Sequence, residues 1–281
     1  MFKTLIDPVT LAAHVNDANW VVVDCRFDLA DPPKGEQLYR ESHVPGARYA
    51  HLDRDLSGTK TGTNGRHPLP TAEEMRARFG AFGIGPATQV VVYDADSGMH
   101  ASRLWWMLRF MGHDAVALVD GGFARWVREG YDTRGGAEAA APATFTGAPR
   151  EEWRLSAEAV SRGLGSPGRV LVDARAEPRF RGDNEPLDAK AGHIPGARNY
   201  FFQRNLTADK TFRSADDLRA DWLTLLDGTP PDQAVMYCGS GVTACHNLLA
   251  LEHAGLPGAR IFPGSWSEWS SDPNRPIATG E

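Results

Sequence analysis

The sequence predicts an α/β protein in which each half of the chain forms a mainly parallel sheet flanked by helices. Short apolar stretches, such as residues 21–23, 90–92 and 234–237, alternate with helical stretches such as residues 71–79 and 243–254. The landmarks of the first half also return in the same order in the second half. A chain of 281 residues is long for one domain and suits two domains.

The internal repeat is visible in four pairs of motifs. V-V-V-D-C-R at 21–26 matches V-L-V-D-A-R at 170–175, and H-V-P-G-A-R at 43–48 matches H-I-P-G-A-R at 193–198. V-V-V-Y-D at 90–94 then matches A-V-M-Y-C at 234–238, and D-G-G-F-A-R-W at 120–126 matches P-G-S-W-S-E-W at 263–269. This order indicates a duplication. We therefore expect a first domain over residues 1–134, a linker over 135–152, and a second domain over 153–281.

Composition excludes several classes of protein. The net charge is −6, and no long basic run would favour nucleic acid as a partner. No apolar run approaches the length of a membrane span, and Asp7 and Pro8 interrupt the N-terminus before a signal peptide could develop, so we expect no membrane association and a cytoplasmic protein. Cys25, Cys238 and Cys245 form no C-x-x-C pair. We expect reduced thiols, with neither a disulfide framework nor a metal site.

Cys238 is the residue whose surroundings predict chemistry. It ends an apolar strand and opens a glycine-rich turn, G-S-G-V-T, that leads into a helix at about residue 243. In parallel sheets, ligands bind beyond the carboxyl ends of strands. Glycines allow backbone N–H groups to curl around one point, and the helix N-terminus adds partial positive charge. The loop is therefore predicted to stabilise an anion on Cys238, either a nucleophilic thiolate or a persulfide.

The stretch C-G-S-G-V-T resembles the active-site loop of 3-mercaptopyruvate sulfurtransferases. The paired H-V-P-G-A and H-I-P-G-A elements, and the ending A-R-I-F-P-G-S-W-S-E-W at 259–269, resemble the two signatures of the rhodanese-like family. The resemblance implies two tandem rhodanese-like domains. It implies a sulfurtransferase that takes sulfur from 3-mercaptopyruvate or thiosulfate onto Cys238 and passes it to cyanide or to a thiol, such as a reduced thioredoxin-like protein. It implies no cofactor.

The same resemblance assigns further site residues. The loop residues Gly239, Gly241, Val242 and Thr243, together with Arg179 of the "RF" element, are expected to bind the donor. Ser240, His67 and Asp53 align with a serine–histidine–aspartate relay that would move protons. One departure concerns Leu187, which stands where mercaptopyruvate enzymes usually have a second arginine in an E-P-R element. Lys190, or a residue of the first domain, could replace it.

The first copy differs at the position of the cysteine. Asp94 stands there, in a loop that is one residue longer, and an aspartate cannot hold a persulfide. We expect the first domain to be non-catalytic but to supply Asp53 and His67 to the site. Residues present in both copies are expected to form a buried polar framework: Asp24, Arg26, His43, Asp173, Arg175 and His193. Cys25 and Cys245 are expected to be inert.

Three alternatives remain beside this interpretation. A cysteine phosphatase would need an arginine six residues after the cysteine, where this chain has Ala244. A thiosulfate-preferring rhodanese usually carries basic residues in the loop, and this loop has none. A non-enzymatic regulatory or sulfur-carrier module would not need the intact Cys238 loop. The sequence leaves the preferred donor, the acceptor and the oligomeric state open.

Overall fold

A computed structural model describes all 281 residues, and the chain divides into two compact units. The first unit comprises Met1–Gly58, Pro70–Arg150 and Thr207–Phe212. The second unit comprises Thr59–Leu69, Glu151–Leu206 and Arg213–Glu281. Each unit therefore includes a short piece of the other half of the sequence. Residues 59–69, which we call the 59–69 segment, belong to the unit that contains Cys238.

The first unit is built on a five-stranded parallel sheet with the order β1-β5-β4-β2-β3. Its strands are β1 (Leu5–Ile6), β2 (Trp20–Asp24), β3 (Arg48–Tyr49), β4 (Gln89–Tyr93) and β5 (Val116–Val119). The central strand β4 is buried along its whole length. A continuous apolar strand of this kind is what a sheet covered on both faces requires.

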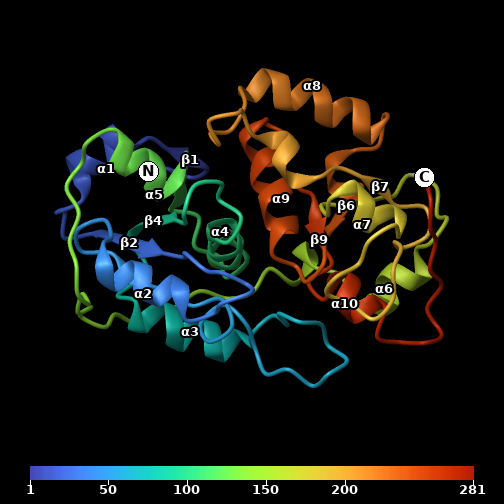
Figure 1. The fold of residues 1–281 in the computed structure, drawn as a ribbon, viewed down its shortest axis with the longest axis horizontal. Coiled ribbons are helices and arrows are strands. Elements are labelled where there is room, and N and C mark those ends of the chain that lie inside the picture. The colour runs from blue at the N-terminus through green and yellow to red at the C-terminus, as the bar shows by residue number, and fades with distance from the viewer. The chain divides into compact units, whose positions relative to one another are not determined.

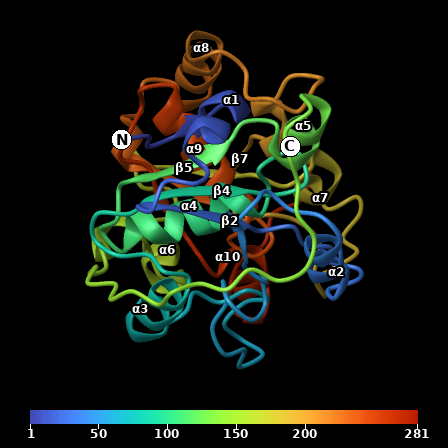
Figure 2. The same ribbon diagram turned by 90° about the vertical axis from the view of Figure 1, so that its left-hand side faces the viewer.

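Helices cover both faces of this sheet. They are α1 (Pro8–His14), α2 (Lys34–Glu41), α3 (Ala72–Ala81), α4 (Ala101–Phe110) and α5 (Gly122–Arg128). Figure 1 shows α1 and α5 on one side of β2 and β4, with α2 and α3 on the other. Figure 2 shows the same layers, with α1 above β4 and β5 and α3 below them. Leu11 and Trp126 bring α1 and α5 into one apolar cluster with Val22, Val91 and Ala117 of the sheet.

The second unit repeats this design with one strand fewer. Its four-stranded parallel sheet has the order β7-β6-β8-β9. The strands are β6 (Val170–Asp173), β7 (Arg198–Asn199), β8 (Ala234–Tyr237) and β9 (Arg260–Ile261). The helices are α6 (Ala157–Arg162), α7 (Glu177–Arg181), α8 (Ala215–Leu226), α9 (Thr243–His253) and α10 (Ser265–Trp269), with short 3₁₀ turns at Glu151–Trp153, Phe202–Asn205 and Pro231–Gln233. Within this unit, α6 and α10 lie on one side of the sheet and α8 and α9 on the other (Figure 1).

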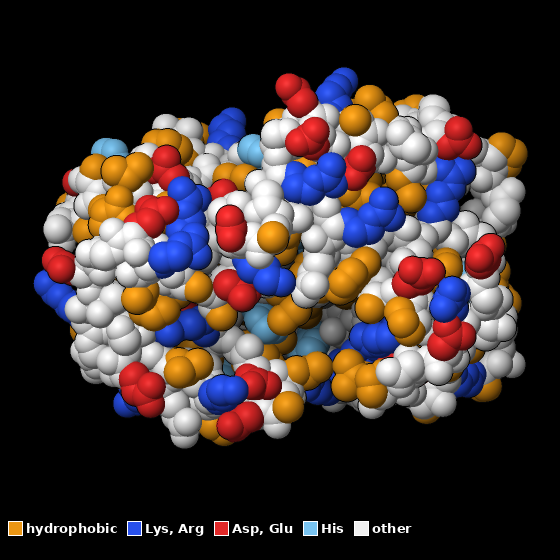
Figure 3. All heavy atoms as spheres, turned by 45° about the horizontal axis from the view of Figure 1, so that its top comes forward, with side chains coloured by type: hydrophobic (Ala, Val, Ile, Leu, Met, Phe, Trp, Pro, Cys, Tyr) orange, Lys and Arg blue, Asp and Glu red, His pale blue; other side chains and the backbone are white.

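The predicted fold class is therefore confirmed, and the predicted helices agree closely with the structure. The helix expected at 71–79 is α3, which Thr71 and Glu74 cap reciprocally. The helix expected at 243–254 is α9, which starts directly after the cysteine loop. On the face drawn in Figure 3, lysine and arginine side chains lie among aspartates and glutamates and form no single basic area. No helix is long and apolar enough to span a membrane.

The duplication extends to individual hydrogen bonds at the ends of the central strands. Arg26 forks onto the buried Asp24 carboxylate, and Arg175 does the same to Asp173. The Tyr93 hydroxyl accepts the N–H of Val44 at 3.2 Å, and the Tyr237 hydroxyl accepts that of Ile194 at 3.2 Å. The ring of His43 contacts the carbonyl oxygen of Tyr39, and that of His193 contacts that of Phe180. These groups are the buried polar framework that the repeat predicts, and each of these hydrogen bonds is formed within one unit.

Candidate active site

Cys238 lies at the carboxyl end of β8, where the chain turns into α9. Its side chain is buried, and the backbone N–H of Gly241 donates a hydrogen bond to its Sγ atom at 3.2 Å. Gly241 has a φ of 77°, a conformation that glycine adopts without a steric penalty. The loop therefore holds an N–H donor on the atom that would carry negative charge.

A second loop supports the cysteine loop from the start of α10. The Ser265 hydroxyl accepts the N–H of Cys238 at 3.1 Å, and the N–H of Trp266 donates to the Cys238 carbonyl oxygen at 3.0 Å. The N–H of Ser267 donates to the Gly239 carbonyl oxygen at 2.9 Å. Ser265 adopts a φ of 55°, which is unusual for a residue other than glycine. These bonds fix the backbone that carries the sulfur.

The 59–69 segment brings His67 to this loop. The Nδ1 atom of His67 lies 2.7 Å from the Oγ atom of Ser240, and both side chains are buried. Two of the three residues predicted to form a relay are therefore hydrogen-bonded to each other within the second unit. Such a pair can move a proton between a buried hydroxyl and an imidazole.

Asp53, the third residue predicted for the relay, belongs to the first unit. It follows β3 in a turn, where its backbone N–H donates to Nδ1 of His51 at 3.1 Å. Its participation in a relay with His67 stays a prediction.

Arg179, the predicted donor-binding arginine, lies on α7 within a series of alternating charges. Its Nη2 atom lies 2.6 Å from Oε1 of Glu185 and 3.4 Å from Oδ2 of Asp188. Glu185 also pairs with Arg175 at 3.1 Å, and Asp188 also pairs with Arg66. We call the whole series the charge chain; in order, its members are Asp173, Arg175, Glu185, Arg179, Asp188 and Arg66. It runs from the end of β6 to the cysteine loop.

The two carboxylates of this chain that bind Arg179 respond to burial in opposite ways. Burial opposes ionisation of Glu185, but the hydrogen bonds from Arg179 and Leu187 and the nearby charge of Arg175 lower the pKa of Glu185 overall. Burial raises the pKa of Asp188, although the charges of Arg66 and Arg179 act against this rise. The ionised form of Glu185 is therefore stabilised within the charge chain, whereas burial destabilises the ionised form of Asp188.

Arg66 was not predicted as a site residue. Its Nη2 atom lies 3.0 Å from the point where a Cβ atom of residue 239 would be, and both terminal nitrogens of Arg179 lie 3.5 Å from that same point. Gly239 thus leaves room for two guanidinium groups beside the cysteine loop. A single arginine in a loop carries no periodic signal. The position of Arg66 directly before His67 in the sequence could have indicated it as a site residue, because a neighbour of the relay histidine must lie near the same loop.

The other predicted loop residues, Gly239, Val242 and Thr243, all lie between Cys238 and the first turn of α9. Leu187 is 44% exposed and lines a cavity of about 330 Å³ together with Lys60, Arg66 and Asp188. Lys190 points its ammonium group at the carbonyl oxygen of Asp272 at 3.4 Å.

In the corresponding loop of the first unit, the Asp94 side chain occupies the backbone N–H groups of the loop. The Asp94 carboxylate accepts hydrogen bonds from the N–H groups of Gly98 at 2.9 Å, His100 at 2.8 Å and Ala101 at 3.1 Å. Asp94 is buried. The N–H groups that could bind an anion in this loop are therefore already occupied by the Asp94 carboxylate.

The remaining cysteines are poor candidates for reaction. Burial raises the pKa of the Cys25 thiol well above its usual value, and the neighbouring charges of Asp24, Asp94 and Asp55 raise it further. Cys245 is buried on α9, and its Sγ atom contacts the carbonyl oxygen of Gly241 at 3.4 Å. No group of three or more histidine, cysteine, aspartate or glutamate side chains is arranged to hold a metal ion.

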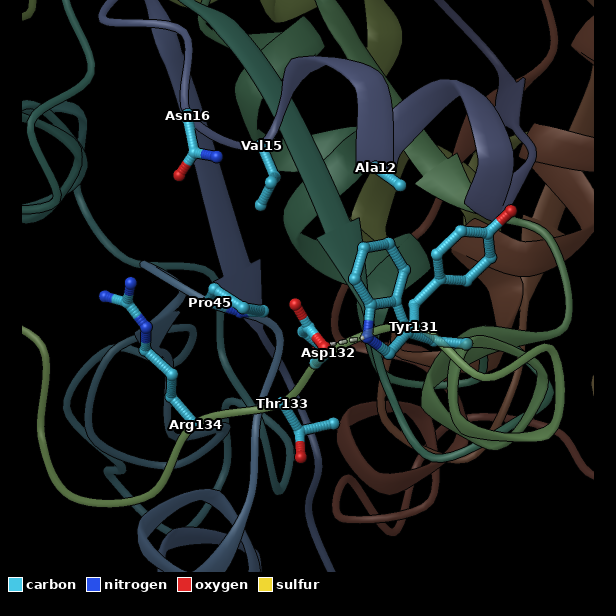
Figure 4. A pocket seen from close by; sticks show the side chains of 9 residues that line it. Ala12, Val15, Asn16, Pro45, Tyr131, Asp132, Thr133 and Arg134 are labelled. Atoms are coloured by element: carbon cyan, nitrogen blue, oxygen red, sulfur yellow. Dashed lines mark hydrogen bonds between the residues drawn. The ribbon is translucent and has the colours of Figure 1, made fainter.

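A separate pocket of about 330 Å³ lies in the first unit (Figure 4). Ala12, Val15, Pro45 and the stretch 131–134 line it, and the indole N–H of Trp126 donates to the Asp132 carbonyl oxygen there at 2.8 Å. Its lining contains neither cysteine nor histidine. The site of interest is therefore the Cys238 loop.

Comparison with known proteins identifies the family to which this chain is similar. The model of the rhodanese-like domain matches residues 7–129 and again residues 156–272. A Pseudomonas aeruginosa protein named "Probable 3-mercaptopyruvate sulfurtransferase" is 46% identical over 279 residues, covering 99% of this chain and 98% of that protein. A thiosulfate sulfurtransferase of Cricetulus griseus is 34% identical, covering 91% of this chain and 84% of that protein.

A solved structure agrees with both matches. The structure of 3-mercaptopyruvate sulfurtransferase from Leishmania major superposes with a TM-score of 0.83 at 32% identity, covering 95% of this chain and 74% of that one. Two family matches in one chain also account for the repeat read from the sequence. The chain therefore belongs to the rhodanese-like family and is a sulfurtransferase with two rhodanese-like domains.

Proposed function

We propose that Cys238 carries sulfur as a persulfide and that 3-mercaptopyruvate is the preferred donor, with thiosulfate as a second one. The observation that carries the proposal is the N–H of Gly241, held 3.2 Å from the Cys238 sulfur. A backbone donor fixed on a thiol sulfur stabilises an anion on that sulfur. No other cysteine of the chain opens a glycine-rich loop before a helix.

The first half-reaction is a displacement at sulfur. The Cys238 thiolate attacks the sulfur of 3-mercaptopyruvate, a sulfur–sulfur bond forms, and the carbon–sulfur bond breaks. The electron pair of that bond leaves on carbon as the enolate of pyruvate. The thiol proton of the donor goes to that carbon, with Ser240 and His67 as the groups placed to pass it on. The products are pyruvate and the anionic persulfide of Cys238.

The second half-reaction returns the thiolate. With cyanide, the outer sulfur leaves as thiocyanate. With a dithiol such as a reduced thioredoxin-like protein, the outer sulfur leaves as hydrogen sulfide and the dithiol becomes a disulfide. We propose this dithiol as the acceptor class.

The charges around Cys238 favour 3-mercaptopyruvate over thiosulfate as the donor. The loop 239–243 itself carries no lysine or arginine, and the two arginines beside it, Arg66 and Arg179, are already paired with Asp188 and Glu185, so the second charge of a divalent anion would be poorly offset there. The carboxylate of 3-mercaptopyruvate suits a guanidinium group, and Arg179 lies beside Gly239. The ketone end is suited to the Ser240 hydroxyl.

The experiment is mass spectrometry of the intact protein after incubation with 3-mercaptopyruvate and no acceptor. We expect one added sulfur, about 32 Da, on Cys238, and loss of both the adduct and turnover in Cys238→Ser. Cys245→Ser is the matched control and should keep both. A sulfur that persists in Cys238→Ser would refute the assignment, and steady-state rates with both donors test the preference.

A further inference from the structure

We propose that Ser265 is a positioning residue for sulfur transfer, because its hydroxyl, presented by a left-handed backbone, fixes the point at which Cys238 leaves the sheet and enters its loop. This inference rests on the proposed function and names a residue on which the position of the reacting sulfur depends. Ser265 acts on the reaction through the backbone of Cys238 and not through the donor.

The hydroxyl of Ser265 lies at the end of the hydrogen-bond ladder between β8 and β9. The N–H of Phe262 donates to the carbonyl oxygen of Met236 at 2.9 Å. In a parallel ladder with this register, the next bond would run from the N–H of Cys238 to the carbonyl oxygen of Phe262. The Ser265 hydroxyl stands between these two groups instead, because it accepts the N–H of Cys238 at 3.1 Å and donates to the Phe262 oxygen at 3.0 Å. It therefore separates the two strands at the residue where the chain turns away from the sheet.

The backbone conformation of Ser265 is unfavourable for a serine. Its φ is 55°, in the left-handed region that residues with a Cβ atom rarely adopt. Ser265 is fully buried, so the surrounding packing holds it in this conformation. Strained residues of this kind persist where the structure over-determines them, and they are concentrated at functional sites. In this conformation the side chain carries the hydroxyl to the bridge between Cys238 and Phe262.

The first repeat has the same backbone at this point without the hydroxyl. Gly122 corresponds to Ser265 and has a φ of 58°. The N–H of Phe123, the residue after it, donates to the carbonyl oxygen of Asp94 at 2.9 Å. The residue after Ser265 makes the equivalent bond to Cys238 at 3.0 Å. Glycine adopts this conformation without a steric penalty, so the backbone arrangement does not by itself require a serine.

The space around the two loops differs between the repeats. A Cβ atom on Gly122 would lie 2.8 Å from the carbonyl oxygen of Asp94 and 2.9 Å from the backbone of Asp96, which leaves no room for a side chain. The loop that begins with Cys238 is one residue shorter, and the Ser265 side chain fits beside it. The serine is therefore found in the repeat that has the reacting cysteine, although a glycine there would be less strained.

Removal of the hydroxyl would leave two buried backbone groups without their present partner. These are the N–H of Cys238 and the carbonyl oxygen of Phe262, and unpaired buried groups of this kind cost free energy. The two groups would then pair directly and extend the ladder. The backbone of Cys238 would be drawn toward β9, and its sulfur would move relative to the N–H of Gly241, which now donates to it at 3.2 Å. A displacement of about 1 Å at a reacting group can lower a rate about a hundredfold.

The experiment compares three variants of the full-length protein in which the hydroxyl and the backbone strain change separately. Ser265→Ala removes the hydroxyl and keeps the strain, and Ser265→Gly removes both. Ser265→Thr keeps the hydroxyl and increases the strain, because a β-branched residue is strongly disfavoured at positive φ. Persulfide formation with 3-mercaptopyruvate is followed by rapid quenching and intact-protein mass spectrometry, and thermal stability is followed by calorimetry.

We expect the maximal rate of persulfide formation to follow the hydroxyl. It should fall about tenfold to a hundredfold in Ser265→Ala and by the same factor in Ser265→Gly, while the donor concentration that gives half the maximal rate stays within about threefold. Ser265→Thr should keep most of the rate. The melting temperature should instead follow the strain, so that Ser265→Gly melts about 2–4 °C above Ser265→Ala, and Ser265→Thr melts below the unchanged protein.

Ser270→Ala is the matched control. Ser270 is a buried serine at the end of α10 with an ordinary helical φ of −74°, and its replacement should leave the rate of persulfide formation unchanged. If the rates of the unchanged protein and the three variants follow their melting temperatures, Ser265 has only a structural role and the inference is overturned. A full rate in Ser265→Ala and Ser265→Gly would overturn it as well.

The outcomes also separate this inference from the proposed function. Absence of a Cys238 persulfide in the unchanged protein would refute the proposed function. A persulfide that forms in the unchanged protein and forms equally fast without the Ser265 hydroxyl would refute this inference alone. Should Ser265→Thr fail to fold, Ser265→Ala and Ser265→Gly decide, because their rates should agree although their melting temperatures differ.

Discussion

His67 and Ser240 are hydrogen-bonded at 2.7 Å although they are 173 positions apart in the sequence. The bond joins an imidazole of the 59–69 segment to a hydroxyl two residues after Cys238. It gives the relay a direct test, because the two sulfur donors differ in their need for a proton. The leaving group of 3-mercaptopyruvate becomes protonated on carbon, and sulfite leaves from thiosulfate without protonation.

We therefore expect His67→Gln and Ser240→Ala to lower kcat with 3-mercaptopyruvate about a hundredfold, within the usual contribution of general acid–base catalysis. The rate with thiosulfate should fall much less. Stopped-flow measurement of persulfide formation with each donor checks this, and Cys245→Ser serves as a control in the helix that follows the loop. An equal fall with both donors would assign the pair a purely structural role.

The isolated second half of the sequence is expected to be inactive. A chain of residues 150–281 keeps Cys238 but lacks the 59–69 segment, and with it the His67–Ser240 bond, the Arg66–Ser267 bond and the contact of Gly65 with Gly264. Turnover should be lost, and the melting temperature should be lower than that of the second unit in the full chain.

A suitable control is the full-length protein cleaved within the exposed linker near Ala139 with both halves kept together. This nicked protein should retain most of its activity, because it retains the 59–69 segment. The interpretation fails if residues 150–281 fold alone and turn over like the full chain.

The sequence predicted those features of the fold and the site that follow from a pattern of neighbouring residues. The fold class follows from alternating apolar strands and helices, and Cys238 stands out because a glycine-rich loop and a helix follow it directly. The assignment of the 59–69 segment to the second unit could not be read in this way. A loop without periodicity packs where tertiary contacts allow, and the position of Gly65 against Gly264 has no local signature. Arg66 was missed for this reason.

Because the Asp94 side chain occupies the loop of the first unit, we expect its removal to lower the stability of that unit without affecting catalysis. Asp94→Ala removes a buried acceptor of three backbone N–H groups, so we expect the free energy of unfolding of the first unit to fall by about 2–4 kcal/mol. Urea denaturation followed by tryptophan fluorescence measures this. Asp96→Ala, in the same loop, should have a much smaller effect. A stable Asp94→Ala protein would show that solvent replaces the carboxylate at little cost.

The lowered pKa of Glu185 predicts how the contribution of the charge chain to stability changes with pH. Its pKa in the folded protein lies below the ordinary value of 4.5, so its stabilising contribution is fully present above that value. The contribution is lost as the pH falls through the lowered folded-state pKa. Glu185→Gln should therefore be less stable than the unchanged protein at pH 7, and the difference should shrink below about pH 4.5. Chemical denaturation at several pH values checks the trend, and a difference independent of pH would contradict it.

The assignment of the 59–69 segment to the second unit has a counterpart, since Thr207–Phe212 of the second repeat belongs to the first unit. Both pieces follow the short strand after the H-x-P-G-A-R motif of their own repeat. This is the topology of domain swapping, in which identical chains exchange an equivalent element. Here the exchange is between the two repeats of one chain, so it is intramolecular and occurs at a high effective concentration. The first repeat, which lacks the cysteine, therefore supplies His67 and the rest of the 59–69 segment to the unit that contains Cys238.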